Sequence, residues 1–326
     1  MSIDVLCLRP EADFQRARAL PPAWLKVAYR AAGDTDVAEL MKQARALVIP
    51  AVGPTLPAEL FEATTVKFIQ VTGAGLDRLD LAFLRQQGIA VANVPGGSNE
   101  ALAEYAVTTA SVLLRRFFWA DAEIRNGNYR DFRARMISDS LLGLAGLTVG
   151  VVGFGTIGVA VATAFHERGC SILYHDPAPR DPRAAEALGA KASFLEELLQ
   201  ASDVVSLHVP LLPQTTGLVG TRELAAMKPG AVLIQASRGG VVNEAALAEA
   251  LQSGRLGGAA VDVYSTEPPG PDHPLLALKG EAARRVLFTP HIAGVTRQST
   301  AFLCRAAWRN MERVFAGNEP PQDLVT

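Results

Sequence analysis

The stretch from Leu147 to Asp176 decides the fold, and it reads LTVGVVGFGTIGVAVATAFHERGCSILYHD. An apolar run opens it, followed by three glycines in G-x-G-x-x-G order, which are Gly153, Gly155 and Gly158. A helical pattern and a second apolar run come next, and that run stops at Asp176. Strand, glycine turn, helix, strand and terminal acid in this order predict a βαβ unit that binds a dinucleotide.

Each residue type in this unit has a physical role. Gly153 allows the tight turn from strand to helix, Gly155 leaves room for a pyrophosphate near the backbone, and Gly158 lets the helix pack closely on the strand. The helix begins near Thr156, and its unpaired N–H groups and positive dipole end face the phosphates. Asp176, 23 residues after Gly153, is placed to accept hydrogen bonds from the adenosine ribose hydroxyls.

The same region has a second interpretation as a membrane span. The 25 residues from Leu141 to Phe165 carry no charge, which is long enough to cross a bilayer. Six glycines interrupt this run, however, and they fall where a strand, a turn and a helix need them rather than along one helical face. The dinucleotide turn is therefore the better interpretation.

Composition places the chain among globular proteins with small-molecule partners. Its 326 residues suggest two domains, and 49% of them are hydrophobic and 20% charged. The net charge of −2 provides no basic field for nucleic acid or for an anionic membrane surface. We therefore expect neither as a partner.

The cysteines and the amino terminus favour a cytoplasmic location. Cys7, Cys170 and Cys304 are odd in number and far apart, so we expect small buried side chains and neither a disulfide framework nor a metal site. Asp4 and Arg9 break the first apolar run before it could form a signal-peptide core. We infer a reducing compartment.

Strands and helices alternate on both sides of the glycine turn. Before it, apolar runs predict four strands of a small parallel sheet, at 3–8, 46–49, 66–71 and 89–92. After it, four more strands complete a doubly wound sheet, at 204–207, 232–235, 259–263 and 286–288. An amphipathic helix at 296–316 follows the finished sheet, and we expect it to pack on the first domain.

The predicted fold class is therefore α/β, with two Rossmann-like doubly wound parallel-sheet domains. Residues 1–98 and 295–326 would form a discontinuous substrate domain. Residues 99–294 would form an inserted dinucleotide-binding domain, reached through a turn-rich hinge at 93–99.

Polar residues follow the strands of the inserted domain at the point where each strand ends. They are Asp176, His208-Val209-Pro210, Ala236-Ser237-Arg238, Asp262 and Thr289-Pro290-His291. Ligands of open parallel sheets bind in the crevice beyond the carboxyl ends of the strands, so we expect these residues to line one crevice with the dinucleotide.

With these residues in place, the chain resembles the D-isomer-specific 2-hydroxyacid dehydrogenases. The matching stretches cover most of the chain from Val71 to Gly294, in family order. They are TGAGLDRLDL, NVPGGSNEALAEYAV, TVGVVGFGTIG, HVPLLPQTTGLV, MKPGAVLIQASRGGVVNEAALAEAL, GGAAVDVYSTEPP and LFTPHIAG.

The resemblance implies a catalytic set of Arg238, Glu267 and His291. His291 would be the acid/base that exchanges a proton with the keto oxygen as hydride is transferred. Glu267 would hydrogen-bond the far nitrogen of His291, and Arg238 would grip the substrate carboxylate and keto oxygen with its planar fork. Read alone, such an arginine is usually a surface charge and such a glutamate a turn residue, so the assignment depends on the set.

The resemblance also implies binding residues. Asp262 would hold the nicotinamide carboxamide, Leu102 would contact the nicotinamide, and His208 would be adjacent to the cofactor without being catalytic. The backbone N–H groups of Ala74 and Gly75 would bind the substrate carboxylate, although TGAG is also an ordinary turn sequence. The cofactor set in full is Gly153, Gly155, Thr156, Ile157, Gly158, Asp176, His208, Val209, Pro210, Thr215, Ala236, Ser237, Arg238, Asp262, His291, Gly294 and Leu102.

The acid at Asp176 favours NAD over NADP because a 2′-phosphate would meet like charge there, although Arg180 and Arg183 lie within reach of a phosphate.

Phosphoglycerate-type relatives carry an arginine where this chain reads IPAVGP at 49–54, so a phosphorylated substrate is disfavoured. Formate dehydrogenases pair the histidine with glutamine, and phosphite dehydrogenases have a lysine in the loop that here reads Gly73-Ala74-Gly75. Glyoxylate, hydroxypyruvate or a similar short 2-oxo acid remains the preferred substrate.

Two other functions stay open at this point. An NAD-sensing regulator of the corepressor type shares the fold and the three catalytic residues, and a binding module that lost activity is the third possibility.

We further expect a homodimer formed through the nucleotide domain, because the family forms one and because the helical region from Ala101 to Phe118 is apolar. Four arginines at 125, 130, 133 and 135 fit an exposed or interface surface better than an anion site.

Overall fold

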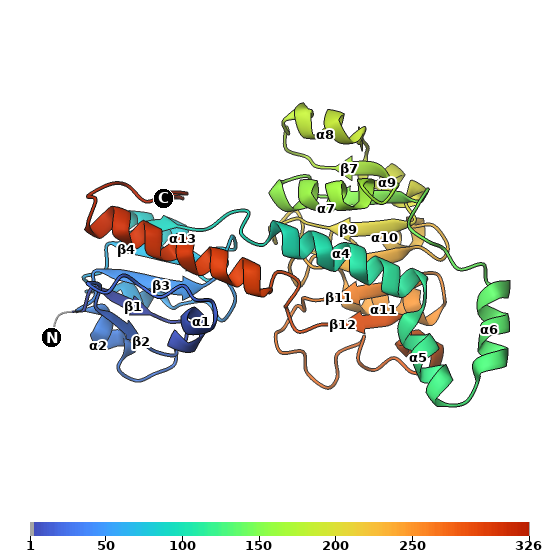
Figure 1. Ribbon diagram of the computed structural model, residues 1–326, viewed down its shortest axis with the longest axis horizontal. Coiled ribbons are helices and arrows are strands. Elements are labelled where there is room, and N and C mark those ends of the chain that lie inside the picture. Colours follow the sequence, from blue (N-terminus) through green and yellow to red (C-terminus); the bar gives the residue numbers. More distant parts are fainter. Residues whose placement is uncertain (1–2, 326) are drawn as a thin grey trace. The chain divides into compact units, whose positions relative to one another are not determined.

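A computed structural model describes residues 3–325 of the chain. The chain divides into two compact units (Figure 1). Unit 1 combines the described residues up to Ser98 with those from Val295 onward, and unit 2 is Asn99–Gly294. The predicted fold class is confirmed, because each unit is built on a parallel sheet and unit 2 is inserted into unit 1.

Unit 1 contains a five-stranded parallel sheet in the order β2-β1-β3-β4-β5. Its strands are β1 Val5–Cys7, β2 Val27–Tyr29, β3 Ala46–Pro50, β4 Phe68–Thr72 and β5 Ala90–Ala92. The expectation of four strands was wrong by one, because β2 is a three-residue strand at the sheet edge whose residues are only half-buried. Its apolar run is only three residues long and lies between Lys26 and Arg30, so the sequence pattern did not identify it.

Helix α13, Arg297–Phe315, closes one face of the unit 1 sheet, as expected from its amphipathic pattern (Figure 1). Trp308 donates from Nε1 to the carbonyl of Ala19 at 2.8 Å, and Asn310 donates to the buried Gln70 at 2.6 Å. The other helical elements of unit 1 are α1 Glu11–Arg16, α2 Val37–Met41, the 3₁₀ turn η1 Ala58–Phe61 and α3 Leu81–Gln86.

Unit 2 contains a seven-stranded parallel sheet in the order β12-β11-β10-β9-β6-β7-β8. Its strands are β6 Thr148–Val152, β7 Ser171–His175, β8 Lys191–Ala192, β9 Val204–Leu207, β10 Val232–Gln235, β11 Gly258–Val261 and β12 Val286–Phe288. The strand order reverses between β6 and β9, and this is the place where parallel sheets of this kind bind ligands.

Helices cover both faces of this sheet. Helices α4 and α7 pack together on one face, and their contact buries Ala106, Ala110, Val161 and Phe165 (Figure 1). Small and apolar side chains at this contact let the two helices approach closely. The helices of unit 2 are α4 Asn99–Leu114, α5 Phe117–Arg125, α6 Tyr129–Ser138, α7 Thr156–His166, α8 Pro182–Leu188, α9 Leu195–Ala201, α10 Thr221–Ala226, α11 Glu244–Gln252 and α12 Gly280–Ala283.

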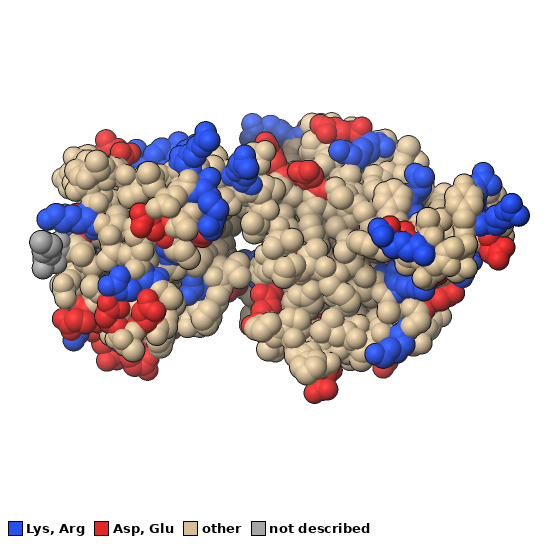
Figure 2. All heavy atoms as spheres, turned by 60° about the horizontal axis from the view of Figure 1, so that its bottom comes forward, with Lys and Arg blue, Asp and Glu red and all other residues tan. Residues whose placement is uncertain are grey.

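Several expectations from composition can be compared with the structure. Cys7, Cys170 and Cys304 are unpaired and buried, as expected, and desolvation raises the pKa of Cys7 to about 12. No helix within residues 3–325 is long and apolar enough to span a bilayer. On the face drawn in Figure 2, basic and acidic side chains are interspersed over each unit.

Candidate functional site

The glycine turn after β6 has the shape that a dinucleotide requires. Gly153 has a φ of +90°, and a Cβ there would lie 2.5 Å from the carbonyl oxygen of His208. A Cβ on Gly158 would lie 2.0 Å from the carbonyl oxygen of Gly153, so only glycine lets α7 start this close to the strand. At Gly155 an added Cβ would meet no described atom within 4 Å.

The amino end of α7 fits the pyrophosphate of NAD. Gly155 caps this 11-residue helix without a side-chain hydrogen bond, so no side chain covers the helix end. The N–H groups of the first turn, which includes Thr156 and Ile157, and the positive end of the helix dipole are suited to phosphate oxygens. Open space at Gly155 lies beside these donors.

Two glycine substitutions should separate packing from cofactor binding. Gly158→Ala is expected to lower the free energy of unfolding by about 1–3 kcal/mol, because the new Cβ overlaps backbone. Gly155→Ala should leave that free energy unchanged yet weaken NADH binding, because its methyl fills the open space. Thermal unfolding and NADH fluorescence titration measure the two effects. Undiminished NADH binding by Gly155→Ala would contradict this use of the turn.

Asp176 lies at the end of β7, and its side chain is buried. Burial by itself raises the pKa of this carboxyl, but hydrogen bonds from Arg180 and from the N–H groups of Phe154 and Ala178 outweigh it, so the pKa is lowered. The N–H of Phe154 is 2.7 Å and Nε of Arg180 is 2.8 Å from Oδ2. The second arginine considered for a phosphate, Arg183, pairs with Asp181.

The loop after β9 carries His208 and its neighbours. Desolvation lowers the pKa of His208 to about 4, so the ring is neutral at pH 7, and its Nε2 lies 2.8 Å from Oγ of Ser206. Thr215 donates to the carbonyl of Pro210 at 2.6 Å and thereby folds the loop that also contains Val209.

The loop after β10 presents Arg238. Ser237 and Gln235 are buried, and the Gln235 side chain accepts from the Ser237 hydroxyl at 2.7 Å and donates to the carbonyl of Arg238 at 2.9 Å. Nη1 of Arg238 donates to the carbonyl of Ser237 at 2.8 Å. The backbone from Ala236 to Arg238 is therefore fixed by a buried amide.

His291 and Glu267, two residues of the predicted catalytic set, lie in direct contact. Nδ1 of His291 lies 2.9 Å from Oε2 of Glu267, and the Glu267 carboxylate also accepts from the N–H of Tyr264 at 3.1 Å. A Cβ on Gly239 would overlap the carbonyl of Tyr264, so the loops that carry Arg238 and Glu267 pack directly against each other. Because Nδ1 faces the glutamate, Nε2 is the atom available for proton exchange.

The backbone of His291 is strained and firmly held. Its φ is +55°, a left-handed conformation that costs a residue other than glycine about 1–3 kcal/mol. Asp262, which is 1% exposed, holds three consecutive N–H groups at 2.8 Å: its carbonyl accepts from His291, and its carboxylate accepts from Ile292 and Ala293. Gly294 follows and ends unit 2. Asp262 therefore shapes this loop, in addition to the cofactor contact expected of it.

The remaining predicted residues are placed as follows. Leu102 lies in α4 and is buried, whereas Ala74 and Gly75 belong to unit 1 and follow β4. Ala74 is exposed, and its carbonyl accepts from the Asn93 side chain at 2.8 Å. The Ala74–Gly75 turn is therefore an ordered, accessible loop.

The sequence did not identify Arg78, Tyr105 and Tyr264 as site residues. Arg78 is 4% exposed and donates to the carbonyls of Pro54 and Pro50, at 2.8 and 3.0 Å. Tyr264 donates to the carbonyl of Thr289 at 2.9 Å, and Tyr105 lies 2.7 Å from the Thr289 hydroxyl. Both tyrosines lie in quoted motifs, but only the fold shows that they meet at Thr289.

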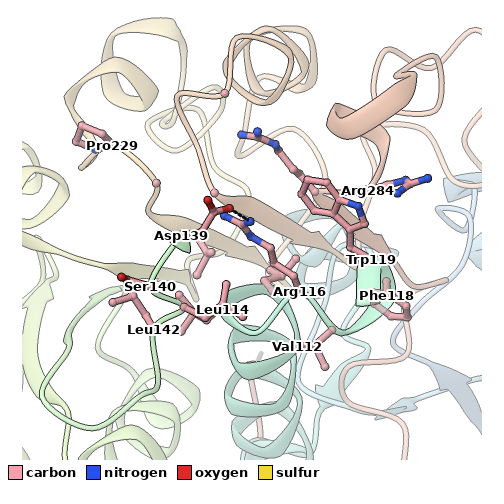
Figure 3. A pocket seen from close by; sticks show the side chains of 17 residues that line it. Val112, Leu114, Arg116, Phe118, Trp119, Asp139, Ser140, Leu142, Pro229 and Arg284 are labelled. Atoms are coloured by element: carbon pink, nitrogen blue, oxygen red, sulfur yellow. Dashed lines mark hydrogen bonds and ion pairs between the residues drawn. The ribbon is translucent and has the colours of Figure 1, made fainter. Parts of the chain in front are cut away.

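A cavity lies elsewhere in unit 2 (Figure 3). It has a volume of about 370 Å³ and is bordered by the segments that precede β10, β11 and β12. These segments lie at the amino ends of the strands, whereas His291 follows the carboxyl end of β12. Trp119 lines it, and the guanidinium groups of Arg116, Arg135 and Arg284 lie 4.4–5.8 Å from that ring. The cavity is therefore separate from the candidate active site.

Comparison with known proteins identifies the family. The NAD binding domain model of the D-isomer specific 2-hydroxyacid dehydrogenases matches residues 107–293. Glyoxylate reductase from Thermococcus litoralis is 37% identical over 270 residues, which cover 82% of this chain and 79% of that protein. Hydroxypyruvate reductase from Blautia hydrogenotrophica is 30% identical over 320 residues, which cover 97% and 96%.

Two further similarities concern protein length and fold. D-3-phosphoglycerate dehydrogenase from Archaeoglobus fulgidus is 38% identical over 243 residues, which are 74% of this chain but only 44% of that protein. The crystal structure of TT0316 protein from Thermus thermophilus aligns with a TM-score of 0.83 at 33% identity, covering 99% of this chain and all of that one. The chain therefore belongs to the D-isomer specific 2-hydroxyacid dehydrogenase family and is an NAD-dependent oxidoreductase.

Proposed function

We propose that this protein interconverts a short, non-phosphorylated D-2-hydroxy acid and its 2-oxo acid, with glyoxylate or hydroxypyruvate as the substrate type. The observation that carries the proposal is the 2.9 Å contact between Nδ1 of His291 and Oε2 of Glu267. His291 follows β12 as the glycine turn follows β6, so both lie at the carboxyl ends of the strands. An imidazole backed by a carboxylate is a proton donor and acceptor suited to a keto oxygen.

The residues divide the chemistry among them. Bound NADH supplies a hydride, and the protein must supply the proton and hold the substrate. Nε2 of His291 gives the proton to the keto oxygen in reduction and takes it back in oxidation. Glu267 holds the Nδ1–H and stabilises the imidazolium formed in oxidation. Arg238 binds the substrate carboxylate and polarises the carbonyl.

The assignment of a short substrate without phosphate rests on unit 1. The loop at 49–54 contains no arginine, and Arg78, which reaches it, is buried with Nε and Nη1 directed at loop carbonyls. Arg78 therefore braces the loop and does not present a cation to a phosphate. The N–H groups of Ala74 and Gly75 are proposed to bind the substrate carboxylate.

NADH absorbance measured with a panel of short 2-oxo acids tests this function. We expect turnover with glyoxylate or hydroxypyruvate, and much less with phosphohydroxypyruvate. Preference for the phosphorylated acid would contradict the substrate assignment. NADH binding without turnover on any member would favour an NAD-sensing regulator instead.

We further propose a homodimer formed through α5, α6 and the end of α4. Six large apolar side chains of this region are between 46% and 61% exposed: Phe117, Phe118, Ile124, Tyr129, Ile137 and Leu142. Two of them, Phe118 and Leu142, line the cavity around Trp119 (Figure 3). Exposed apolar side chains in this number favour contact with another protein surface. The buried, unpaired cysteines fit the reducing cytoplasm that we propose as its location.

Charge placed on this patch should break the dimer. The double substitution Phe118→Asp and Ile137→Asp is expected to shift the mass in solution from dimer to monomer at micromolar concentration, because it introduces carboxylates that a partner would have to bury. Light scattering coupled to gel filtration gives the mass. Phe194→Asp is the matched control, since Phe194 is 77% exposed at the start of α9. A monomeric wild-type protein would contradict the dimer.

A further inference from the structure

The hydroxyl groups of Thr289 and Tyr105 extend the hydrogen-bond network that joins Asp262 to the backbone of His291. Oγ1 of Thr289 donates to Oδ1 of Asp262 at 2.6 Å, and the phenol oxygen of Tyr105 lies 2.7 Å from Oγ1 of Thr289. A hydroxyl has one hydrogen, so Thr289, which donates to Asp262, must accept from Tyr105. Burial raises the pKa of Tyr105, which keeps the phenol protonated as the donor. The chain therefore runs from Tyr105 through Thr289 to Asp262.

These contacts determine how the Asp262 carboxylate is oriented. Oδ1 accepts from both Thr289 and the N–H of Ile292, and Oδ2 accepts from the N–H of Ala293. If the Thr289 donor is lost, the carboxylate can rotate and release one of the two N–H groups. Those groups belong to the residues directly after His291, so the left-handed backbone of His291 would lose its support.

Thr289 is also held from its other side. Its carbonyl accepts from the Tyr264 hydroxyl at 2.9 Å, and the N–H of Tyr264 donates to Glu267. Tyr105 comes from α4, 184 residues away from Thr289 in the sequence. Contacts from α4 and from the Glu267 loop thus converge on the residue two positions before His291.

We propose that Tyr105 and Thr289 are positioning residues for the proton transfer: they hold Asp262 so that the loop at 291–293 directs His291 toward Glu267. Neither residue touches the reacting atoms. The inference rests on the proposed function, in which His291 exchanges the proton. It extends that function to a hydroxyl pair that joins α4 to the catalytic loop.

Steady-state kinetics of hydroxyl variants test the proposal. Thr289→Val is expected to lower kcat by about 10-fold, because the variant loses a hydrogen bond to a buried carboxylate. Tyr105→Phe removes only the outer donor and should lower kcat about 3-fold. Thr289→Ser keeps the hydroxyl and should restore kcat to within about 2-fold of wild type, while the KM for NADH changes by no more than about 2-fold in all three variants.

The matched control is Thr109→Val. Thr109 lies one turn after Tyr105 in α4, and within residues 3–325 its hydroxyl bonds to carbonyls of that helix alone, those of Tyr105 and Ala106. We expect wild-type kcat from this control. An unchanged kcat in Thr289→Val, a rise in the KM for NADH without a fall in kcat, or an equal loss in Thr289→Ser would overturn the proposal.

A second readout does not require turnover. Long-range ¹H–¹⁵N spectra report the tautomer of each histidine, and the signals of His291 are identified by their loss in His291→Ala. We expect a single tautomer protonated at Nδ1 in wild type and Thr289→Ser, and a mixture in Thr289→Val. A wild-type signal in Thr289→Val would overturn the positioning role. If no 2-oxo acid is reduced at all, the proposed function fails, while this spectrum still decides on the positioning.

Discussion

Replacing His291 by alanine is expected to slow 2-oxo acid reduction by about 10²- to 10⁴-fold, the range typical for loss of a general acid. The imidazole is the group that would deliver the proton, and Glu267 cannot replace it, because that carboxylate is directed at the Nδ1 side of the ring. NADH binding should persist, because the glycine turn and Asp176 are unchanged. Stopped-flow absorbance gives the rate, and fluorescence titration gives the affinity for NADH.

The control for this variant is a histidine elsewhere in unit 2. His166 is exposed at the end of α7, and His166→Ala should reduce substrate at the wild-type rate. Turnover by His291→Ala within a few-fold of wild type would rule out His291 as the acid.

Arg238→Lys is expected to lower kcat/KM for the 2-oxo acid by about 10- to 100-fold, although the positive charge is retained. Lysine cannot reproduce the two parallel N–H groups that grip a carboxylate, and its ammonium cannot also reach the keto oxygen. The loop backbone should stay in place, because the Gln235 amide holds the carbonyl of residue 238 rather than its side chain.

Arg183→Lys serves as the comparison, since Arg183 is exposed and pairs only with Asp181 among the contacts described. It should match wild type in both kcat and KM. A fall in NADH affinity in Arg238→Lys, with kcat/KM for the acid intact, would instead assign Arg238 to the cofactor.

The sequence predicted most strands of both sheets but missed β2 and β8. The runs that became β6, β9 and β10 have the bounds expected of them, because these central parallel strands are buried on both faces and are continuously apolar. The two missed strands are short and lie at sheet edges: β2 has three half-buried residues and β8 has two exposed residues.

The sequence could predict a feature of the site only where that feature depends on residues close together in the chain. The close backbone approaches at Gly153 and Gly158 could be predicted, because both glycines lie in one turn that is continuous in the sequence. Tyr105 could not, because a tyrosine in an amphipathic helix has the pattern of an ordinary core residue, and its partner Thr289 is 184 positions away. The left-handed backbone of His291 has no signature either, since glycine or asparagine usually occupies such a position.

The insertion of unit 2 into unit 1 has a consequence for synthesis on the ribosome. The core of the unit 1 sheet joins Val5, Cys7 and Phe14 to Cys304, Trp308 and Met311 of α13. Translation proceeds from the amino terminus, so β1–β5 emerge long before the helix that covers them. All of unit 2 is made in between and can fold first. During that time one apolar face of the unit 1 sheet stays uncovered, because α13 has not yet been synthesised. The last-made helix therefore completes the first-made domain.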